Sequence, residues 1–289
     1  EYAIPVAGAL SAALSSIVSG PSSTIDSIDI FGVTDHKQVS DWNSSRPPIV
    51  DDSLHSLFQR NAMLYPEAPA IASWDDHMTY AELDKKSSQL AYLLLKMGVG
   101  SEDLIPICFD KSTWAIVSML GALKAGAGFV PLDPSSPASR LQLIIQQTAS
   151  TLVLASENKL ALVVDLVPEV LVVSARASIW DEENSDVLND RVSPLSVAYV
   201  LFTSGSTGTP KGVVMQHAAV STSVIHHGKE IGCNSATRMF QFAAFTFDAC
   251  ILEIFTTLAY GGCICIPSDA ERMSDIAGAM ARLNANTSF

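Results

Sequence analysis

Short apolar runs alternate with longer segments of helical periodicity along most of this 289-residue chain. Apolar runs bounded by turn residues predict buried strands, and apolar positions at helical spacing predict helices. Such alternation predicts an α/β fold with parallel sheets covered by helices. The expected strands are 70–74, 104–109, 128–132, 151–155, 197–202, 238–243 and 263–266, with weaker elements at 160–164 and 170–173, and the expected helices are 52–65, 79–97, 112–125, 137–149, 217–229, 249–259 and 270–283.

The composition narrows the class of protein. The chain is 48% hydrophobic and 16% charged, which predicts a large buried core. Its net charge of −13 repels nucleic acid and anionic membranes, so neither is an expected partner. The five cysteines lie mostly in apolar runs and form no C-x-x-C pair. We therefore expect buried, reduced thiols in a cytoplasmic protein, and no metal site.

Residues 1–50 differ in character from the rest. Residues 4–21 carry no charge, but the preceding Glu1 has the wrong sign for a signal peptide, and a transmembrane helix would be more apolar. We expect a helix at 11–19 that ends an upstream domain, followed by a linker through residue 50. Because neither end has a natural start or stop, we expect a fragment in which residues 51–289 form a truncated domain core.

The segment 203–212 reads Thr-Ser-Gly-Ser-Thr-Gly-Thr-Pro-Lys-Gly and lies between the apolar runs 197–202 and 213–215. It holds five hydroxyl groups, three glycines and Lys211. Glycines let backbone N–H groups approach an anion, hydroxyls add donors, and lysine adds a mobile positive charge. The segment therefore predicts a loop that binds polyphosphate. A flexible Gly/Ser linker is the alternative, which the flanking strands disfavour.

The segment does not match the Walker loop of P-loop enzymes. That loop requires G-x-x-x-x-G-K-[ST] running into a helix. Here Lys211 follows Pro210, and a glycine and a strand-like run follow Lys211. A kinase-like P-loop enzyme is therefore disfavoured.

Asp248 is a second residue that could carry chemistry, because it lies where a strand region gives way to a helix. Asp is a favoured helix N-cap, so capping is one interpretation. The other starts from Ala249 and Leu252, which fall on the same side of the helix start. A carboxylate beside two apolar positions could hold a cationic amine whose side chain lies in an apolar pocket.

The histidines and the acidic residues suggest no further site. His217 is expected to cap a helix, and His226 and His227 lie at adjacent angles on one predicted helix, so they do not share a ligand easily. The acidic segment 181–190 predicts a solvated surface.

Four segments resemble motifs of one family. Residues 198–212 resemble the nucleotide-binding signature of the adenylate-forming superfamily, which includes acyl-CoA synthetases, luciferases and the adenylation domains of nonribosomal peptide synthetases. The sequence Phe-Asp-Ala-Cys at 247–250 is similar to the Phe-Asp-x-Ser motif of those adenylation domains, with Cys250 in place of Ser. Residues 78–83 and 120–134 resemble two further motifs of the same branch, although Gly128-Phe129 replaces Ala-Tyr in the second.

The resemblance extends over residues 22–289 and implies an architecture. Segments 40–43 and 53–58 look like the connection between a condensation domain and an adenylation domain. Residues 1–50 would then be the end of a condensation-type domain and its linker. Residues 51–289 would be an incomplete large N-terminal subdomain of an adenylate-forming enzyme.

The resemblance also implies a reaction and a set of binding residues. An amino acid and ATP would give aminoacyl-AMP and pyrophosphate, with Mg²⁺, and the aminoacyl group would pass to a phosphopantetheine thiol on a carrier domain outside this chain. Condensation and carrier domains of the same polypeptide would be the partners. Asp248 would bind the substrate ammonium, with Phe247, Ala249 and Leu252 around it. The expected ATP-binding residues are Thr203, Ser204, Gly205, Ser206, Thr207, Gly208 and Lys211.

The resemblance implies that the catalytic lysine lies beyond residue 289, so the chain alone should bind ATP weakly and not turn over. Two alternatives remain open at the level of sequence. An acyl- or aryl-CoA ligase of the same superfamily would not need Asp248. A non-catalytic, decayed module would keep the fold, but the intact loop 203–212 argues against decay.

Overall fold

The computed structural model describes residues 3–44, 46–180, 192–204 and 209–288. The chain divides into two compact units, Glu1–Pro48 and Ile49–Phe289. The acidic segment 181–190 lies outside the described residues, as do Gly205, Ser206, Thr207 and Gly208 of the expected phosphate loop.

The first unit is helical and has no buried residue among those described. It contains α1 (Ala3–Ser19), a 3₁₀ turn (Ile25–Ser27) and α2 (Val33–Ser44). The sequence predicted an irregular linker after residue 20, and α2 differs from that expectation. Local polar contacts support this helix, since the Asp35 carboxylate accepts from Gly32 N at 2.9 Å and Lys37 pairs with Asp41 one turn on at 2.5 Å.

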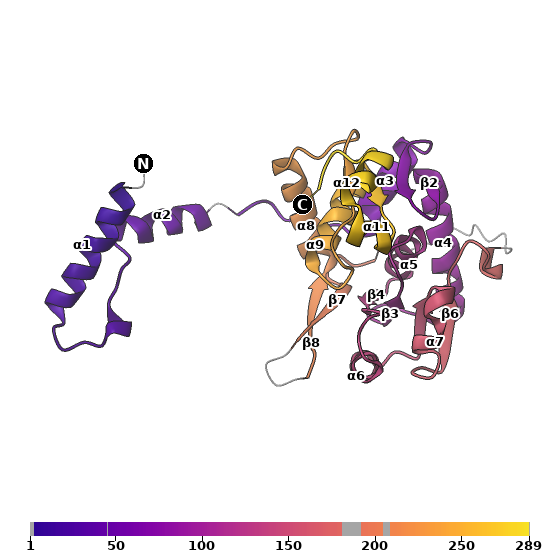
Figure 1. Cartoon of the computed structure of the whole chain (residues 1–289), viewed down its shortest axis with the longest axis horizontal. Coiled ribbons are helices and arrows are strands. Elements are labelled where there is room, and N and C mark those ends of the chain that lie inside the picture. Colours follow the sequence, from indigo (N-terminus) through magenta and orange to yellow (C-terminus); the bar gives the residue numbers. More distant parts are fainter. Residues whose placement is uncertain (1–2, 45, 181–191, 205–208, 289) are drawn as a thin grey trace. The chain divides into compact units, whose positions relative to one another are not determined.

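The second unit contains two sheets (Figure 1). The larger has the strand order β6-β5-β3-β4-β7-β8, and the smaller has the order β2-β1-β10-β9. Parallel pairing prevails in both, which confirms the predicted α/β class. The strands are β1 (Pro69–Ser73), β2 (His77–Thr79), β3 (Leu104–Cys108), β4 (Gly128–Pro131), β5 (Leu152–Ala155), β6 (Glu169–Val172), β7 (Val197–Thr203), β8 (Lys211–Gln216), β9 (Arg238–Phe240) and β10 (Cys263–Ile266).

Two strand pairs are antiparallel, which the alternation of strands and helices did not predict. β2 pairs with β1, and β8 pairs with β7. Both are joined by short connections that leave no room for a crossover helix, so the chain turns back on itself. β8 is an edge strand, and Val213 and Val214 are exposed on it.

The helices follow the expected segments closely. They are α3 (Leu54–Leu64), α4 (Tyr80–Lys96), α5 (Thr113–Lys124), α6 (Ala138–Thr148), α7 (Leu160–Val163), α8 (His217–Glu230), α9 (Asp248–Ile251), α10 (Thr257–Ala259), α11 (Asp269–Ser274) and α12 (Ile276–Arg282). Thr79 and Glu82 form a capping box at the start of α4. A π-helical turn, Leu252–Thr256, connects α9 to α10 within the segment predicted as one helix. The helix predicted over 270–283 is broken at Asp275, whose carboxylate accepts from Gly278 N and caps α12.

The main core lies between the two sheets. All 12 residues of α5 are buried, and the largest apolar cluster joins Ile71 and Ile264 of the smaller sheet to Ile105 and Phe129 of the larger. Alternate residues of the larger sheet face a second cluster beneath α6 and α7. The larger sheet is therefore covered on both faces, and Thr203, the first residue of the expected phosphate loop, ends β7.

Candidate functional site

A cavity of about 500 Å³ lies between the β7–β8 hairpin, α6 and the segment that leads into α9. It brings together two stretches that the sequence analysis singled out separately, the end of β7 and the start of α9. Its wall is mostly apolar and also carries polar and charged side chains. The lining residues are Pro131, Asp133, Ser136, Arg140, Ile144, Tyr199, Leu201, Phe202, Thr203, Ser204, Val213, Met215, Thr246, Phe247 and Asp248.

Thr203 and Ser204 are two of the polar residues that line this cavity. β7 is buried over its first residues and becomes exposed at Thr203, so the hydroxyls emerge where the strand leaves the core. Lys211 is the first residue of β8 and lies opposite Thr203 in the hairpin register. The Thr203 hydroxyl donates to the Lys211 carbonyl at 3.4 Å, and the Gln147 side chain of α6 donates to the Pro210 carbonyl at 3.2 Å. The hairpin thus holds Lys211 beside the two hydroxyls, although Lys211 is not among the described lining residues.

Asp248 also lines the cavity. It is the first residue of α9, and Phe247 before it is the N-cap, with no side-chain capping bond. The interpretation of Asp248 as an N-cap is therefore wrong. The Asp248 side chain is exposed to the cavity, and no hydrogen bond or ion pair joins its carboxylate to any residue that the structure describes. Its charge near the positive end of the helix dipole is favourable and leaves the carboxylate oxygens available to a ligand.

The other residues expected around the substrate amine lie differently. Phe247 lines the cavity and is 65% exposed. Ala249 and Leu252 are half-buried and do not belong to the cavity lining among the described residues. Leu252 begins the π-helical turn, whose wider winding shifts it relative to an ideal α-helix.

Sequence analysis assigned no role to two lining residues, Arg140 and Tyr199. Arg140 is half-buried on α6 and is the one Lys or Arg side chain among the described residues that line the cavity. Tyr199 lies on β7 against Phe129, with ring centroids 5.7 Å apart. Burial raises the pKa of Tyr199 to about 12, so its phenol stays neutral. The spacing of apolar residues in 137–149 predicts an amphipathic helix. It does not predict which residues lie next to the polar face of that helix, where Arg140 is found.

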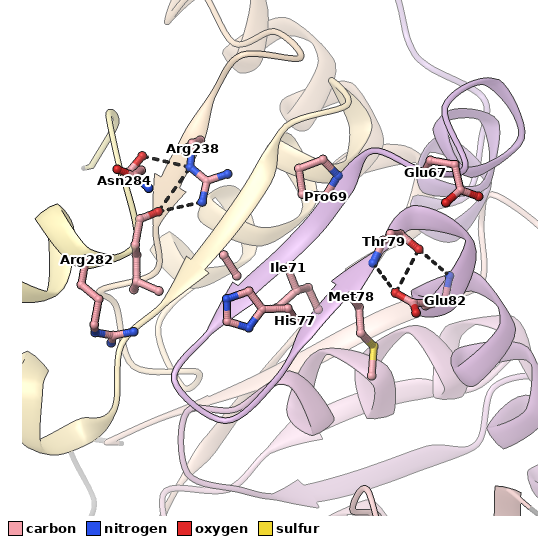
Figure 2. A pocket seen from close by; sticks show the side chains of 12 residues that line it. Glu67, Pro69, Ile71, His77, Met78, Thr79, Glu82, Arg238, Arg282 and Asn284 are labelled. Atoms are coloured by element: carbon pink, nitrogen blue, oxygen red, sulfur yellow. Dashed lines mark hydrogen bonds between the residues drawn. The ribbon is translucent and has the colours of Figure 1, made fainter.

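A second hollow of about 480 Å³ lies over the smaller sheet (Figure 2). Several of its polar side chains have partners within the fold. Arg238 donates to the carbonyls of Leu283 and Asn284, Arg282 pairs with Glu271 at 2.6 Å, and Glu82 completes the capping box. None of the predicted site residues lines it. The first cavity is therefore the candidate site.

His217 and His55 form a buried pair beside α3 and not a metal site. The Nδ1 atom of His217 accepts from Leu54 N at 3.2 Å, so His217 caps α3, and the rings of His217 and His55 meet edge to face at 5.6 Å. Burial lowers the pKa of His217 to about 4 and that of His55 to about 3. In the described part of the chain, no three His, Cys, Asp or Glu side chains could hold a metal ion together.

The five cysteines are free and buried, as the composition predicted. Across the ranges that the structure describes, no helix has the length and apolar character needed to span a bilayer.

Residues 58–289 match the family model of AMP-binding enzymes. The chain is 41% identical over 277 residues to nonribosomal peptide synthetase 4 of Gibberella zeae, and 45% identical over 266 residues to nonribosomal peptide synthetase TES of Alternaria alternata. These alignments cover 96% and 92% of this chain but only 4% and 5% of the two relatives. The chain thus corresponds to a small part of each.

Two solved structures share the fold. The N-terminal subdomain of Klebsiella oxytoca NpsA is 25% identical, with a TM-score of 0.70 over 83% of this chain and 61% of that chain. The nonribosomal peptide synthetase FmoA3, bound to α-methyl-L-serine-AMP, is 24% identical, with a TM-score of 0.72 over 81% of this chain and 26% of that one. These similarities confirm the resemblance that the motifs indicated and the predicted subdomain fold.

Proposed function

The chain belongs to the AMP-binding enzyme family, and from this premise we propose that it forms the N-terminal part of an adenylation domain in a nonribosomal peptide synthetase. Residues 51–289 would be this part of the domain, and residues 1–50 would connect it to a condensation domain. A carrier domain of the same protein would receive the product.

The proposed reaction activates an amino acid with ATP. A carboxylate oxygen of the amino acid attacks the α-phosphorus of ATP, the bond to the bridging oxygen breaks, and aminoacyl-AMP and pyrophosphate result. A phosphopantetheine thiol on the carrier domain then displaces AMP. Charge accumulates on phosphate oxygens during the first step, so donors and cations fixed near them lower its barrier.

The observation that carries this proposal is the cavity that joins Thr203 and Ser204 to Asp248. The hydroxyls, with Arg140 on the same wall and Lys211 beside them, suit the phosphates of ATP. Asp248 suits the ammonium group of an amino acid, because its carboxylate has no partner among the described residues. The apolar wall formed by Tyr199, Met215 and their neighbours would hold the substrate between these polar groups.

The proposed phosphate loop also includes Gly205, Ser206, Thr207 and Gly208. They are included because their residue types suit phosphate binding. Mg²⁺ would accompany ATP and offset charge on its phosphates. The described residues do not fit a resident metal site, so we derive no step through a metal that this chain holds.

An amino-acid substrate distinguishes the proposed adenylation domain from an acyl- or aryl-CoA ligase. Such a ligase acts on acids that have no α-ammonium group, and Asp248 would then face its substrate with an unpaired charge. The test is ATP–pyrophosphate exchange by the longer protein that contains this chain, with the common amino acids compared with benzoate and octanoate. We expect exchange with an amino acid.

Asp248→Asn is the matching variant. It keeps the shape of the side chain and removes the charge that pairs with the ammonium, so we expect the KM for the amino acid to rise by about tenfold to a hundredfold, the range expected for the loss of a hydrogen bond to a charged group. Asp165→Asn is the control, because Asp165 is exposed and lies away from the cavity. Exchange driven only by acids without an amine would contradict the proposal.

A further inference from the structure

Three buried polar side chains, Lys111, Gln241 and Glu253, contact the segment that leads into α9. Their exposed fractions are 4%, 0% and 1%. Lys111 comes from the connection between β3 and α5, Gln241 follows β9, and Glu253 lies in the π-helical turn. We call these three residues the buried brace. None of them lines the 500 Å³ cavity.

The buried brace holds one short stretch of backbone from both sides. The Lys111 ammonium donates to the Gln241 side-chain oxygen at 2.5 Å and to the Ala243 carbonyl at 2.6 Å. The Gln241 amide donates to Glu253 at 2.7 Å and to the same Ala243 carbonyl at 2.8 Å. Glu253 in turn accepts from the backbone N–H groups of Phe242 and Ala243, at 3.2 Å each. Both backbone polar groups of Ala243 are therefore fixed.

The residues that follow Ala243 form part of the cavity wall. Thr246, Phe247 and Asp248 line it. The Lys111 ammonium also lies 4.9 Å from the centre of the Phe245 ring, and the Cys250 thiol donates to the Phe245 carbonyl at 3.3 Å. Asp248 is thus connected to the buried brace through the four residues 244–247.

Burying an ammonium and a carboxylate is costly, and apolar side chains of similar volume would fill this space at lower cost. Burial accordingly lowers the pKa of Lys111 to about 8 and raises that of Glu253. A fully hydrogen-bonded polar cluster, unlike an apolar one, specifies a single backbone arrangement. The π-helical turn supports this role, because such turns occur often at functional sites and this one carries Glu253.

We propose that Lys111 and Glu253 are positioning residues, which hold segment 241–247 so that the Asp248 carboxylate meets the ammonium group of the substrate. This inference rests on the proposed function, and it concerns the amino-acid site at Asp248 only. Neither side chain touches the substrate, and neither acts on the phosphate site at Thr203 and Ser204.

The test compares Lys111→Met and Glu253→Gln in the longer protein. Both variants keep side-chain volume and remove a charge. We expect the KM for the amino acid in pyrophosphate exchange to rise about tenfold, the size of effect that a small misplacement of a binding group causes, with the KM for ATP nearly unchanged. Amide hydrogen exchange at residues 243–250 should become faster in both variants.

Lys124→Met is the matched control. Lys124 is also buried, pairs with Asp84 at 2.7 Å and lies over the Phe58 ring, but it contacts α4 and not segment 241–247. We expect it to lower the melting temperature without changing the KM for the amino acid. If Lys111→Met does not fold, Glu253→Gln, which is nearly isosteric, tests the same proposal.

The outcomes separate this inference from the proposed function. Equal changes in both KM values, or unchanged hydrogen exchange at 243–250, would overturn the positioning role. If no amino acid supports pyrophosphate exchange by the wild-type protein, the proposed function is refuted instead. In that case faster hydrogen exchange in Lys111→Met, but not in Lys124→Met, would still support the buried brace as the device that fixes this segment.

Discussion

Arg140 is the residue outside the loop 203–212 that is best placed to contact phosphate. It lines the cavity with Thr203 and Ser204, and no described residue pairs with its guanidinium. A charge-assisted hydrogen bond to phosphate contributes about 1.5–3 kcal/mol, so Arg140→Ala should raise the KM for ATP by about tenfold or more. The KM for the amino acid should change little. Pyrophosphate exchange at varied ATP concentration measures both.

Arg176→Ala provides the control for that prediction, since Arg176 is exposed and lines none of the cavities described above. An unchanged KM for ATP in Arg140→Ala would remove Arg140 from the phosphate site.

Sequence and structure differ in what each reveals about single residues. Asp248 could be found from the sequence because a carboxylate stands out beside apolar neighbours at a helix start. Arg140 could not, because the surface that a polar helical residue meets depends on packing against β7 and β8. Lys111 and Glu253 lie 142 positions apart in the chain (253 − 111), and only the fold shows that they hold the same backbone.

At the scale of elements, His217 connects the base of the β7–β8 hairpin to α3. Its Nδ1 atom accepts from Leu54 N, and protonation at Nδ1 would break this bond. Because burial lowers the pKa of His217 to about 4, the unfolded chain binds the proton first as the pH falls below about 6.5. The free energy of unfolding should therefore decrease from about pH 6.5 to about pH 4, by on the order of 3 kcal/mol for this residue.

Urea unfolding at pH 7, 5.5 and 4.5 would measure this decrease. Carboxyl groups also contribute in this range, so the comparison with His217→Gln isolates the histidine. Glutamine can accept from Leu54 N without titrating, and the variant should lose less stability on acidification. Identical pH dependence in both proteins would show that His217 does not couple the hairpin to α3.

The elements that sequence analysis missed have local causes. Periodicity identifies an apolar run as a strand but carries no sign of its direction, so the antiparallel pairing of β8 with β7 follows only from the short connection between them. The π-helical turn and the break at Asp275 depend on hydrogen bonds that side chains make after packing. The helix start at Thr79 was predictable because its capping box is complete within four residues.

At the scale of the whole molecule, the alternation of strands and helices predicted covered parallel sheets but not their division into two. Strands such as β3 and β10 are apolar throughout, because both of their faces are buried. That pattern gives no information on which sheet a strand joins. The division depends on helix packing as well, because α5, which is buried along its whole length, packs against β3 and β4 of the larger sheet and against α4.

The two units make different contributions to the stability of the protein. Every buried residue of the described chain lies in the second unit, whereas α1 exposes Ile4, Leu10 and Leu14. Removal of residues 1–48 should therefore change the melting temperature by no more than about 2 °C, because it removes no residue of the core. Thermal unfolding of 1–289 and 49–289, followed by circular dichroism, measures the difference. A clearly lower melting temperature for 49–289 would mean that the first unit stabilises the second, and that the core described here is not sufficient for the fold.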